Sequence, residues 1–114
     1  MKYKIEDDRI FIDLFDKFNK KYSGDFNDLF NNLRINNIPL TDKQKLLVID
    51  YFNICSEEYL WYKKGRIPKN VWLAWKSGIQ ENLAIKEVGD LFKSEVLSSN
   101  SKISYYGLSE ELGY

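Results

Sequence analysis

Residues 41–65 read TDKQKLLVIDYFNICSEEYLWYKKG, and they predict one long helix around which the rest of the chain folds. Thr41 and Gln44 have the spacing of a capping box, in which each side chain hydrogen-bonds the other residue's backbone N–H at the start of a helix. Gly65 supplies the stop, because glycine readily adopts the left-handed conformation that ends a helix. Apolar residues fall on nearly every side between these two signals, which is typical of a helix at the centre of a bundle.

Pro68 predicts a second helix directly after this stop, because proline favours the first positions of a helix. The apolar residues that follow share one helical face: Val71, Trp72, Trp75, Ile79 and Leu83. The two helices are expected to form an antiparallel hairpin around Gly65. We expect Trp72 and Trp75 to lie in the core of this hairpin. Trp61 lies on a different stripe, where it is either packed against another helix or exposed.

Three further segments show the apolar spacing of amphipathic helices. They run from about Asp7 to Lys21, from Asp25 to the Asn36-Asn37 pair, and from about Ile85 to Leu97. A serine-rich run at 98–101 predicts a flexible connection. The tail at 98–114 is either flexible or docked, and it retains Ile103, Tyr105, Tyr106 and Leu108 as apolar contacts.

The composition fits one compact helical domain that spans residues 1–114. A chain of this length can bury a single core without a metal ion or a disulfide. Two prolines and six glycines leave few breaks, which favours a few long elements over many short strands. We therefore predict an all-α bundle of four to five helices with a central helical hairpin.

Residues that commonly carry catalysis are scarce. Cys55 is the one cysteine and there is no histidine, so neither a disulfide, a cysteine-based zinc site nor a histidine-assisted thiol nucleophile is expected. Cys55 also falls on the broad apolar face of the central helix, where a thiol acts as a small hydrophobe. There is no glycine-rich phosphate loop. We expect no enzymatic activity, no metal and no cofactor.

Three carboxylates on the central helix form the enzymatic alternative: Asp50, Glu57 and Glu58. Asp50 and Glu57 are about 10 Å apart along the helix axis, which is too far for them to share a metal ion directly. Acid pairs that do chemistry need surroundings that separate their pKa values. A solvated face is the favoured interpretation of these residues.

The start of the sequence contains neither an apolar run of the kind found in signal peptides nor a membrane span. A cytoplasmic location without membrane insertion is therefore expected. Lysine outnumbers arginine, and Asn and Ile are abundant, a bias that AT-rich coding produces. This composition is the basis for expecting a bacterial source of low GC content or a mobile element.

The strongest functional signal is a basic stretch at residues 61–80. It holds five cations and no acidic residue, although the whole chain has a net charge of zero. Cations mixed with aromatic residues are typical of surfaces that bind acidic proteins or nucleic acid. We predict a non-enzymatic protein-binding module that recognises an acidic partner surface, with a nucleic-acid-associated protein as the alternative and homo-oligomerisation left open. The predicted partner-binding residues are Trp61, Lys63, Lys64, Arg66 and Lys69.

The central hairpin resembles a group of small uncharacterised bacterial proteins of unknown function that share a tyrosine-rich helix, a Lys-Gly turn and a Trp-x-x-Trp helix. The residues that carry the resemblance are Asp50-Tyr51-Phe52-Asn53, Ser56-Glu57-Glu58-Tyr59, Tyr62-Lys63-Lys64-Gly65, Ile67-Pro68, Val71-Trp72, Trp75 and Gly78-Ile79. Many of those proteins also end in a Ser-Tyr-Tyr-Gly-aliphatic stretch, here residues 104–108. Their hairpin often follows a membrane helix that this sequence does not contain. The resemblance implies a helical fold and no site residues.

Overall fold

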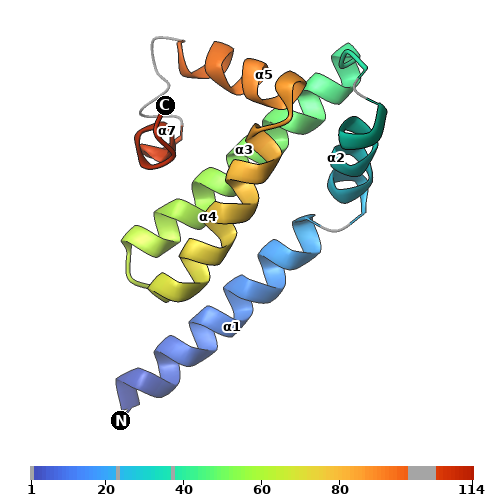
Figure 1. Cartoon of the computed structure of the whole chain (residues 1–114). Helices are drawn as coiled ribbons and strands as arrows, with labels where there is room; N and C mark the ends of the chain where they lie inside the picture. Colours follow the sequence, from blue (N-terminus) through green and yellow to red (C-terminus); the bar gives the residue numbers. More distant parts are fainter. Residues whose placement is uncertain (1, 23, 37, 98–104) are drawn as a thin grey trace.

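The computed structural model describes residues 2–22, 24–36, 38–97 and 105–114, and every regular element in these ranges is a helix (Figure 1). The prediction of an all-α fold is therefore confirmed. In chain order the helices are α1 (Lys2–Tyr22), α2 (Asp25–Asn36), α3 (Asp42–Lys63), α4 (Lys69–Leu83), α5 (Lys86–Val96) and α7 (Leu108–Glu111).

Helix α3 is the central element, as its sequence predicts. The backbone N–H of Gln44 donates to Thr41 Oγ1 at 3.1 Å, and the backbone N–H of Thr41 donates to Gln44 Oε1 at 2.9 Å. These two bonds form the predicted capping box and satisfy N–H groups that a helix start leaves without partners. Helices α1, α2, α4, α5 and α7 all pack against α3.

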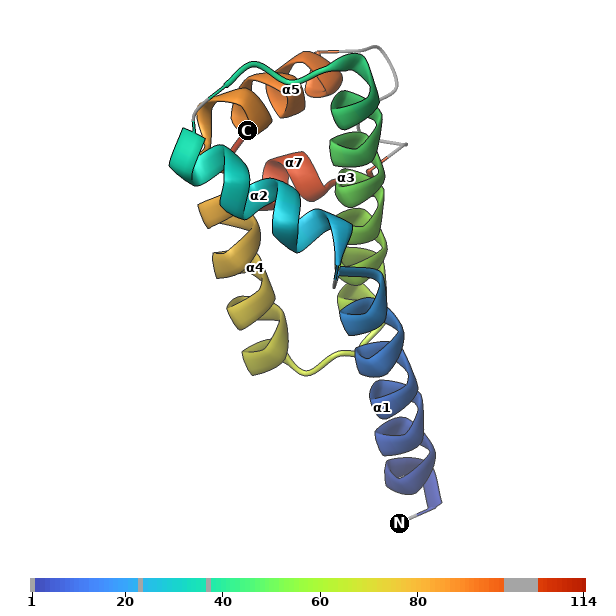
Figure 2. The same ribbon diagram turned by 90° about the vertical axis from the view of Figure 1, so that its right-hand side faces the viewer.

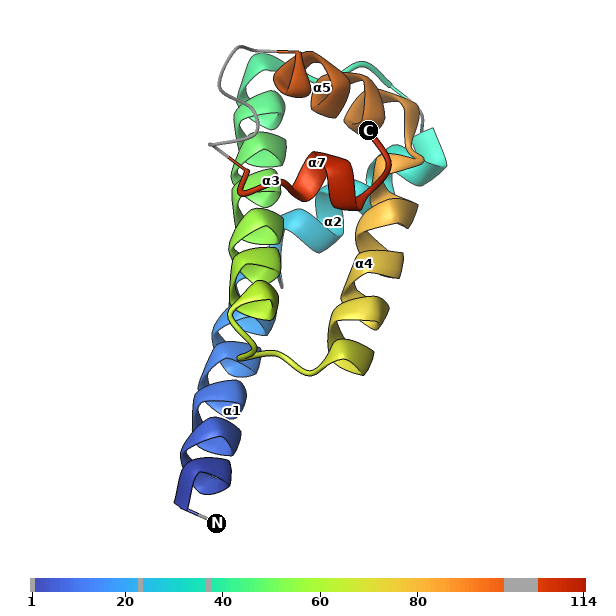
Figure 3. The same ribbon diagram turned by 90° about the vertical axis from the view of Figure 1, so that its left-hand side faces the viewer.

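The helices are arranged around the antiparallel α3–α4 hairpin (Figure 2). Helix α5 lies across the end of the hairpin that is distant from its turn, and α7 lies beside α3 (Figure 3). Helix α1 runs beside α3 and its N-terminal part extends past the hairpin turn, which gives the molecule extents of 51 × 31 × 21 Å. None of the helices in the described ranges combines the length and the apolar run that a bilayer crossing needs.

The core is rich in aromatic side chains contributed by several helices. Phe30, Phe52 and Phe92 are fully buried, and the ring centroids of Phe52 and Phe92 lie 4.9 Å apart in an edge-to-face arrangement. Tyr51 meets the Phe30 ring at 4.7 Å, also edge to face. Such pairs add to the hydrophobic stabilisation of burying the rings. Cys55 is buried among them, as expected for a thiol that serves as a small hydrophobe.

Helix α1 is longer than predicted, because it begins at Lys2 rather than near Asp7. Acidic residues favour the first turns of a helix but do not mark its first residue. No proline or glycine lies in residues 2–22, so nothing local stops the helix from extending toward the N-terminus.

The tail contributes a short helix that the apolar spacing did not predict. Tyr105, Leu108 and Leu112 are buried in the core, whereas Tyr106 is exposed. Gly107 has a φ of +86°, which turns the chain into α7. Of the residues expected to form or dock the tail, Ile103 and the serine-rich run at 98–101 lie outside the described ranges.

Candidate functional site

The turn of the α3–α4 hairpin has a fixed backbone. The N–H of Gly65 donates to the carbonyl of Tyr62 at 2.9 Å, and the N–H of Arg66 donates to the carbonyl of Trp61 at 3.0 Å. This pair of bonds is the Schellman arrangement, and it requires the left-handed conformation that Gly65 adopts with a φ of +77°. Ile67 is buried and anchors the turn to the core. The side chains on this turn are therefore presented from a backbone held by hydrogen bonds and by the buried Ile67.

Trp61 lies half-buried on the last turn of α3. Its ring packs against the edge of the hydrophobic core, and the Nζ of Lys64 lies 5.1 Å from the centroid of that ring. A cation above an indole face is attracted by the negative charge of the π system. The structure thus answers the question that the helical wheel left open, since Trp61 is packed on one side and accessible on the other.

Two of the five cations of the basic stretch fasten the tail to the hairpin. The Nζ of Lys63 donates to the backbone carbonyl of Tyr106 and lies 4.7 Å from the centroid of the Tyr59 ring. The Nζ of Lys76 lies 2.9 Å from Glu111 Oε1 in a half-buried ion pair. Lys63 is one of the predicted partner-binding residues, and in this structure its ammonium group contacts the docked tail.

Lys64, Arg66 and Lys69 are exposed on or beside the turn. Together with Trp61 they form a surface that we name the basic turn, defined as Trp61, Lys64, Arg66 and Lys69. The basic turn lies at the end of the hairpin toward which α1 extends (Figure 1). Four of the five predicted partner-binding residues therefore lie at the same end of the hairpin.

The other two tryptophans belong to the interior rather than to this surface. Trp72 is 1% exposed and its ring stacks on Tyr62 with a centroid distance of 5.5 Å. Trp75 is half-buried, 5.8 Å from the ring of Phe15 and 5.9 Å from that of Phe18. Trp72 agrees with the expected core position, and Trp75 lies between α4 and α1.

The three carboxylates of α3 have different surroundings. Asp50 is exposed, and Glu57 pairs with Lys21 at 3.4 Å. Glu58 is half-buried, and burial, followed by the negative charge of Glu57, raises its pKa to about 8. The interpretation of a solvated face fits Asp50 but is wrong for Glu58. Within the described ranges, no group of three or more acidic or cysteine side chains is arranged to hold a metal ion.

Glu58 lines a cavity of about 170 Å³ between α1, α3 and α4. Aromatic rings of Phe18, Tyr22, Tyr51 and Trp75 form much of its wall. This combination of a carboxylate and several rings is a second candidate site, distinct from the basic turn. The polar residues of this cavity come from three helices, so the tertiary fold brings them together.

A buried hydrogen-bond network borders this cavity. Asn82 is 2% exposed, and its Nδ2 donates to Tyr51 Oη at 2.8 Å and to Tyr22 Oη at 3.3 Å. The guanidinium of Arg34 donates to Asn82 Oδ1. Sequence reasoning missed Asn82, although one signal was present, because Asn82 follows Ile79 by three positions on the apolar face of α4.

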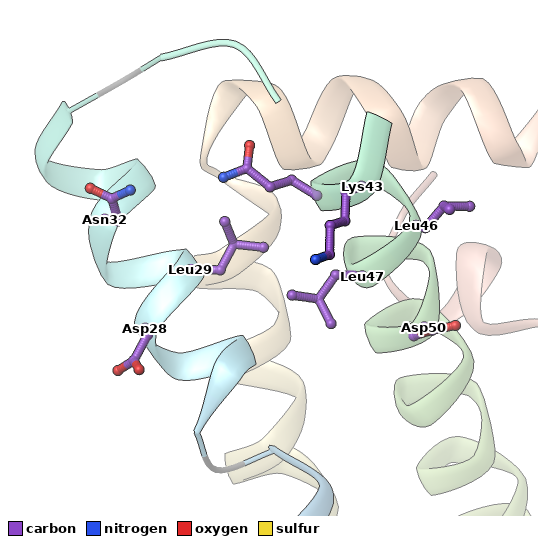
Figure 4. Close-up of a pocket in the computed structure, with 8 residues that line it drawn as sticks. Asp28, Leu29, Asn32, Lys43, Leu46, Leu47 and Asp50 are labelled. Atoms are coloured by element: carbon purple, nitrogen blue, oxygen red, sulfur yellow. The ribbon is translucent and has the colours of Figure 1, made fainter. Parts of the chain in front are cut away.

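A surface hollow of about 660 Å³ lies between α2 and the start of α3 (Figure 4). Leu29 and Leu47 form its apolar wall, and Leu46 is exposed beside it. Asp28 and Asp50 lie among its polar lining residues. The hollow is open to solvent and is lined by both apolar and charged side chains, so it indicates no particular ligand.

Comparison with known proteins adds no further assignment, since no protein-family model, curated protein or solved structure matches this chain.

Proposed function

We propose that this protein is a non-enzymatic protein-binding module and that the basic turn binds an acidic surface on its partner. The observation that carries this proposal is the placement of exposed Lys64, Arg66 and Lys69 around accessible Trp61 on a turn with a fixed backbone. Aromatic residues and arginine are enriched in the centres of protein interfaces. Rigid presentation lowers the conformational entropy lost on binding.

Electrostatics supports the choice of an acidic partner. Residues 61–80 carry five cations and no acid, and Lys63 and Lys76 are engaged with the tail. The other three cations of this stretch, Lys64, Arg66 and Lys69, are exposed on the basic turn. Complementary charge raises the rate of association and selects among partners, and the effect weakens as salt screens it.

The test is a charge reversal confined to this surface, Lys64→Glu/Arg66→Glu/Lys69→Glu. It leaves Lys63 intact, so the contact with the Tyr106 carbonyl that helps to dock the tail is preserved. Partners are captured from nuclease-treated host lysate, and the affinity of each purified partner is then measured by titration calorimetry. We expect the triple variant to lose at least tenfold in affinity, with the loss shrinking as salt rises.

A matched control carries the same change in net charge elsewhere. Lys43→Glu/Lys45→Glu/Lys93→Glu reverses three exposed cations on α3 and α5, distant from the turn. This control should bind the partner as the wild type does. Equal loss in both triple variants would mean that net charge, rather than the basic turn, governs binding and would overturn the proposal.

Nucleic acid is the second candidate ligand for the same cations. If it is retained instead of a protein, the logarithm of its affinity should fall with the logarithm of salt concentration with a slope of about −3 for three phosphate contacts. Binding of a protein partner after nuclease treatment distinguishes the two. Self-association through the same surface would appear as a change in sedimentation that the triple variant loses.

The biological setting that we propose rests on composition. A cytoplasmic regulator or inhibitor encoded by a phage, plasmid or defence locus in an AT-rich bacterium fits the lysine, asparagine and isoleucine bias and the short chain. The identity of the captured partner tests this setting directly.

A further inference from the structure

The cavity between α1, α3 and α4 combines one carboxylate with a wall of aromatic rings. Phe18 and Tyr22 come from α1, Tyr51 and Glu58 from α3, and Trp75 from α4. Its volume of about 170 Å³ is close to that of an engineered protein cavity that holds benzene. The cavity is therefore large enough for a molecule of roughly that size.

The Glu58 carboxylate has no cationic partner in the described part of the chain. The Lys21 ammonium pairs with Glu57 at 3.4 Å, and the Arg34 guanidinium donates to Asn82 Oδ1. No hydrogen bond or ion pair to Glu58 is found among the described side chains. A half-buried carboxylate without a counter-ion is costly, and a bound cation would relieve that cost.

The aromatic residues that line the cavity also favour a cationic ligand. Tyr and Trp rings attract cations through the negative charge of their π faces, and sites that recognise alkylammonium groups are lined by several such rings. Tyr22 and Asn19 also line the cavity, and their side chains carry a hydroxyl and an amide group that can accept hydrogen bonds. From this geometry we propose that the cavity binds a small organic monocation, with its charged group against Glu58 and its apolar surface against the rings.

The charged and titratable groups around Glu58 set how binding depends on pH. On α3 these groups are Glu57, Tyr51 and Cys55. On α1 they are Tyr22 and Lys21, and Lys21 pairs with Glu57. On α2 the group is Arg34, which hydrogen-bonds Asn82 of the cavity lining. The residues that α4 contributes to the lining are Ala74, Trp75, Gly78, Ile79 and Asn82, which do not titrate.

Glu58 must be ionised to pair with a cation, and burial together with Glu57 raises its pKa to about 8. A proton and the cation therefore compete for the same carboxylate. Affinity should rise with pH and level off above about pH 8. The ionised fraction that follows from this pKa predicts roughly a hundredfold gain between pH 6 and pH 9.

The experiment is titration calorimetry of the full chain with tetramethylammonium at pH 6 and pH 9. An uncharged molecule of the same shape, tert-butanol, is the comparison ligand. We expect tetramethylammonium to bind with the stated pH dependence and tert-butanol to bind at least tenfold more weakly at pH 9. Glu58→Gln should lose at least tenfold in affinity for tetramethylammonium and should lose the pH dependence.

Two further variants separate binding from folding. Glu57→Gln should retain binding and shift its pH profile downward, because the charge of Glu57 contributes to the raised pKa of Glu58. Trp75→Leu keeps an apolar side chain but removes one aromatic ring, so it should weaken the binding of tetramethylammonium more than that of tert-butanol. The proposal is overturned if tetramethylammonium shows no binding at pH 9 up to about 10 mM, if tert-butanol binds equally well, or if a folded Glu58→Gln variant binds unchanged.

Discussion

The Nζ of Lys76 lies 2.9 Å from Oε1 of Glu111, and this ion pair joins α4 to α7 across 35 positions of sequence. The pair is half-buried, so solvent screens it less than an exposed pair. Together with the bond from Lys63 to the Tyr106 carbonyl, it shows that part of the basic stretch stabilises the docked tail. The surface that we propose for binding is therefore smaller than the run of cations in the sequence.

The first prediction concerns this ion pair. Lys76→Met keeps the apolar stem of the side chain and removes the charge, so we expect a loss of about 1 kcal/mol in the free energy of unfolding, at the upper end for such pairs. Urea denaturation measures the loss. Hydrogen exchange should show faster exchange in residues 105–114, and unchanged protection of that segment would contradict the assigned role.

The second prediction concerns the buried network around Asn82. Asn82→Leu removes the donor to the buried Tyr51 hydroxyl and one acceptor of the Arg34 guanidinium, so the Tyr51 hydroxyl loses this partner in the interior. We expect a loss of about 1–3 kcal/mol in the free energy of unfolding. Asn53→Leu on the exposed side of α3 is the matched control and should change stability by less than about 0.5 kcal/mol.

The third prediction is that alanine substitutions at two helical glycines change the stability of the protein in opposite directions. A Cβ at Gly78 would meet no heavy atom within 4 Å, so Gly78→Ala should stabilise the protein by about 0.5–1 kcal/mol through helix propensity. A Cβ at Gly89 would lie 2.4 Å from the backbone oxygen of Leu83. Gly89→Ala must therefore push α5 away from the end of α4, at a cost of about 1–3 kcal/mol. Equal stability of the two variants would show that this close approach is absent.

The fourth prediction is a dependence of stability on pH that Glu58 causes. Its folded pKa of about 8 exceeds the value of 4.5 expected without the fold, so the folded protein binds more protons than the unfolded chain between these values. Stability should consequently fall as pH rises from about 4.5 to about 8 and then level off. Glu58→Gln stays neutral throughout, so it should match the wild type near pH 4.5 and exceed it at pH 9.

A series of urea denaturation curves from pH 4.5 to pH 9 measures this difference. Glu57→Gln is the control, and it should reduce the fall rather than abolish it, because burial is the larger cause of the raised pKa. If the wild type and Glu58→Gln differ by the same amount at every pH, Glu58 does not titrate in the way described.

Features that depend on nearby residues were predictable from the sequence. The capping box of Thr41 and Gln44 and the stop at Gly65 each arise from contacts within a few positions, so their spacing specifies them. The central position of α3 followed from its apolar residues on nearly every side. The antiparallel hairpin followed from the two helices and their short connection.

Features that depend on distant residues were not predictable. The partner of Lys63 is 43 positions away and that of Lys76 is 35 positions away, so the basic stretch gave no sign that both cations hold the tail. The burial of Glu58 arises where three helices meet, whereas the helical wheel of α3 alone suggested a solvated face. The short helix α7 has four residues, too few for a periodic pattern.

The most direct test of the basic turn as the proposed binding surface is the salt-dependent affinity of Lys64→Glu/Arg66→Glu/Lys69→Glu for a purified partner, measured beside Lys43→Glu/Lys45→Glu/Lys93→Glu. We predict that the first variant loses at least tenfold in affinity at low salt while the second binds as the wild type does. Wild-type affinity in the first variant, or an equal loss in both, would contradict the claim that the basic turn is the binding surface.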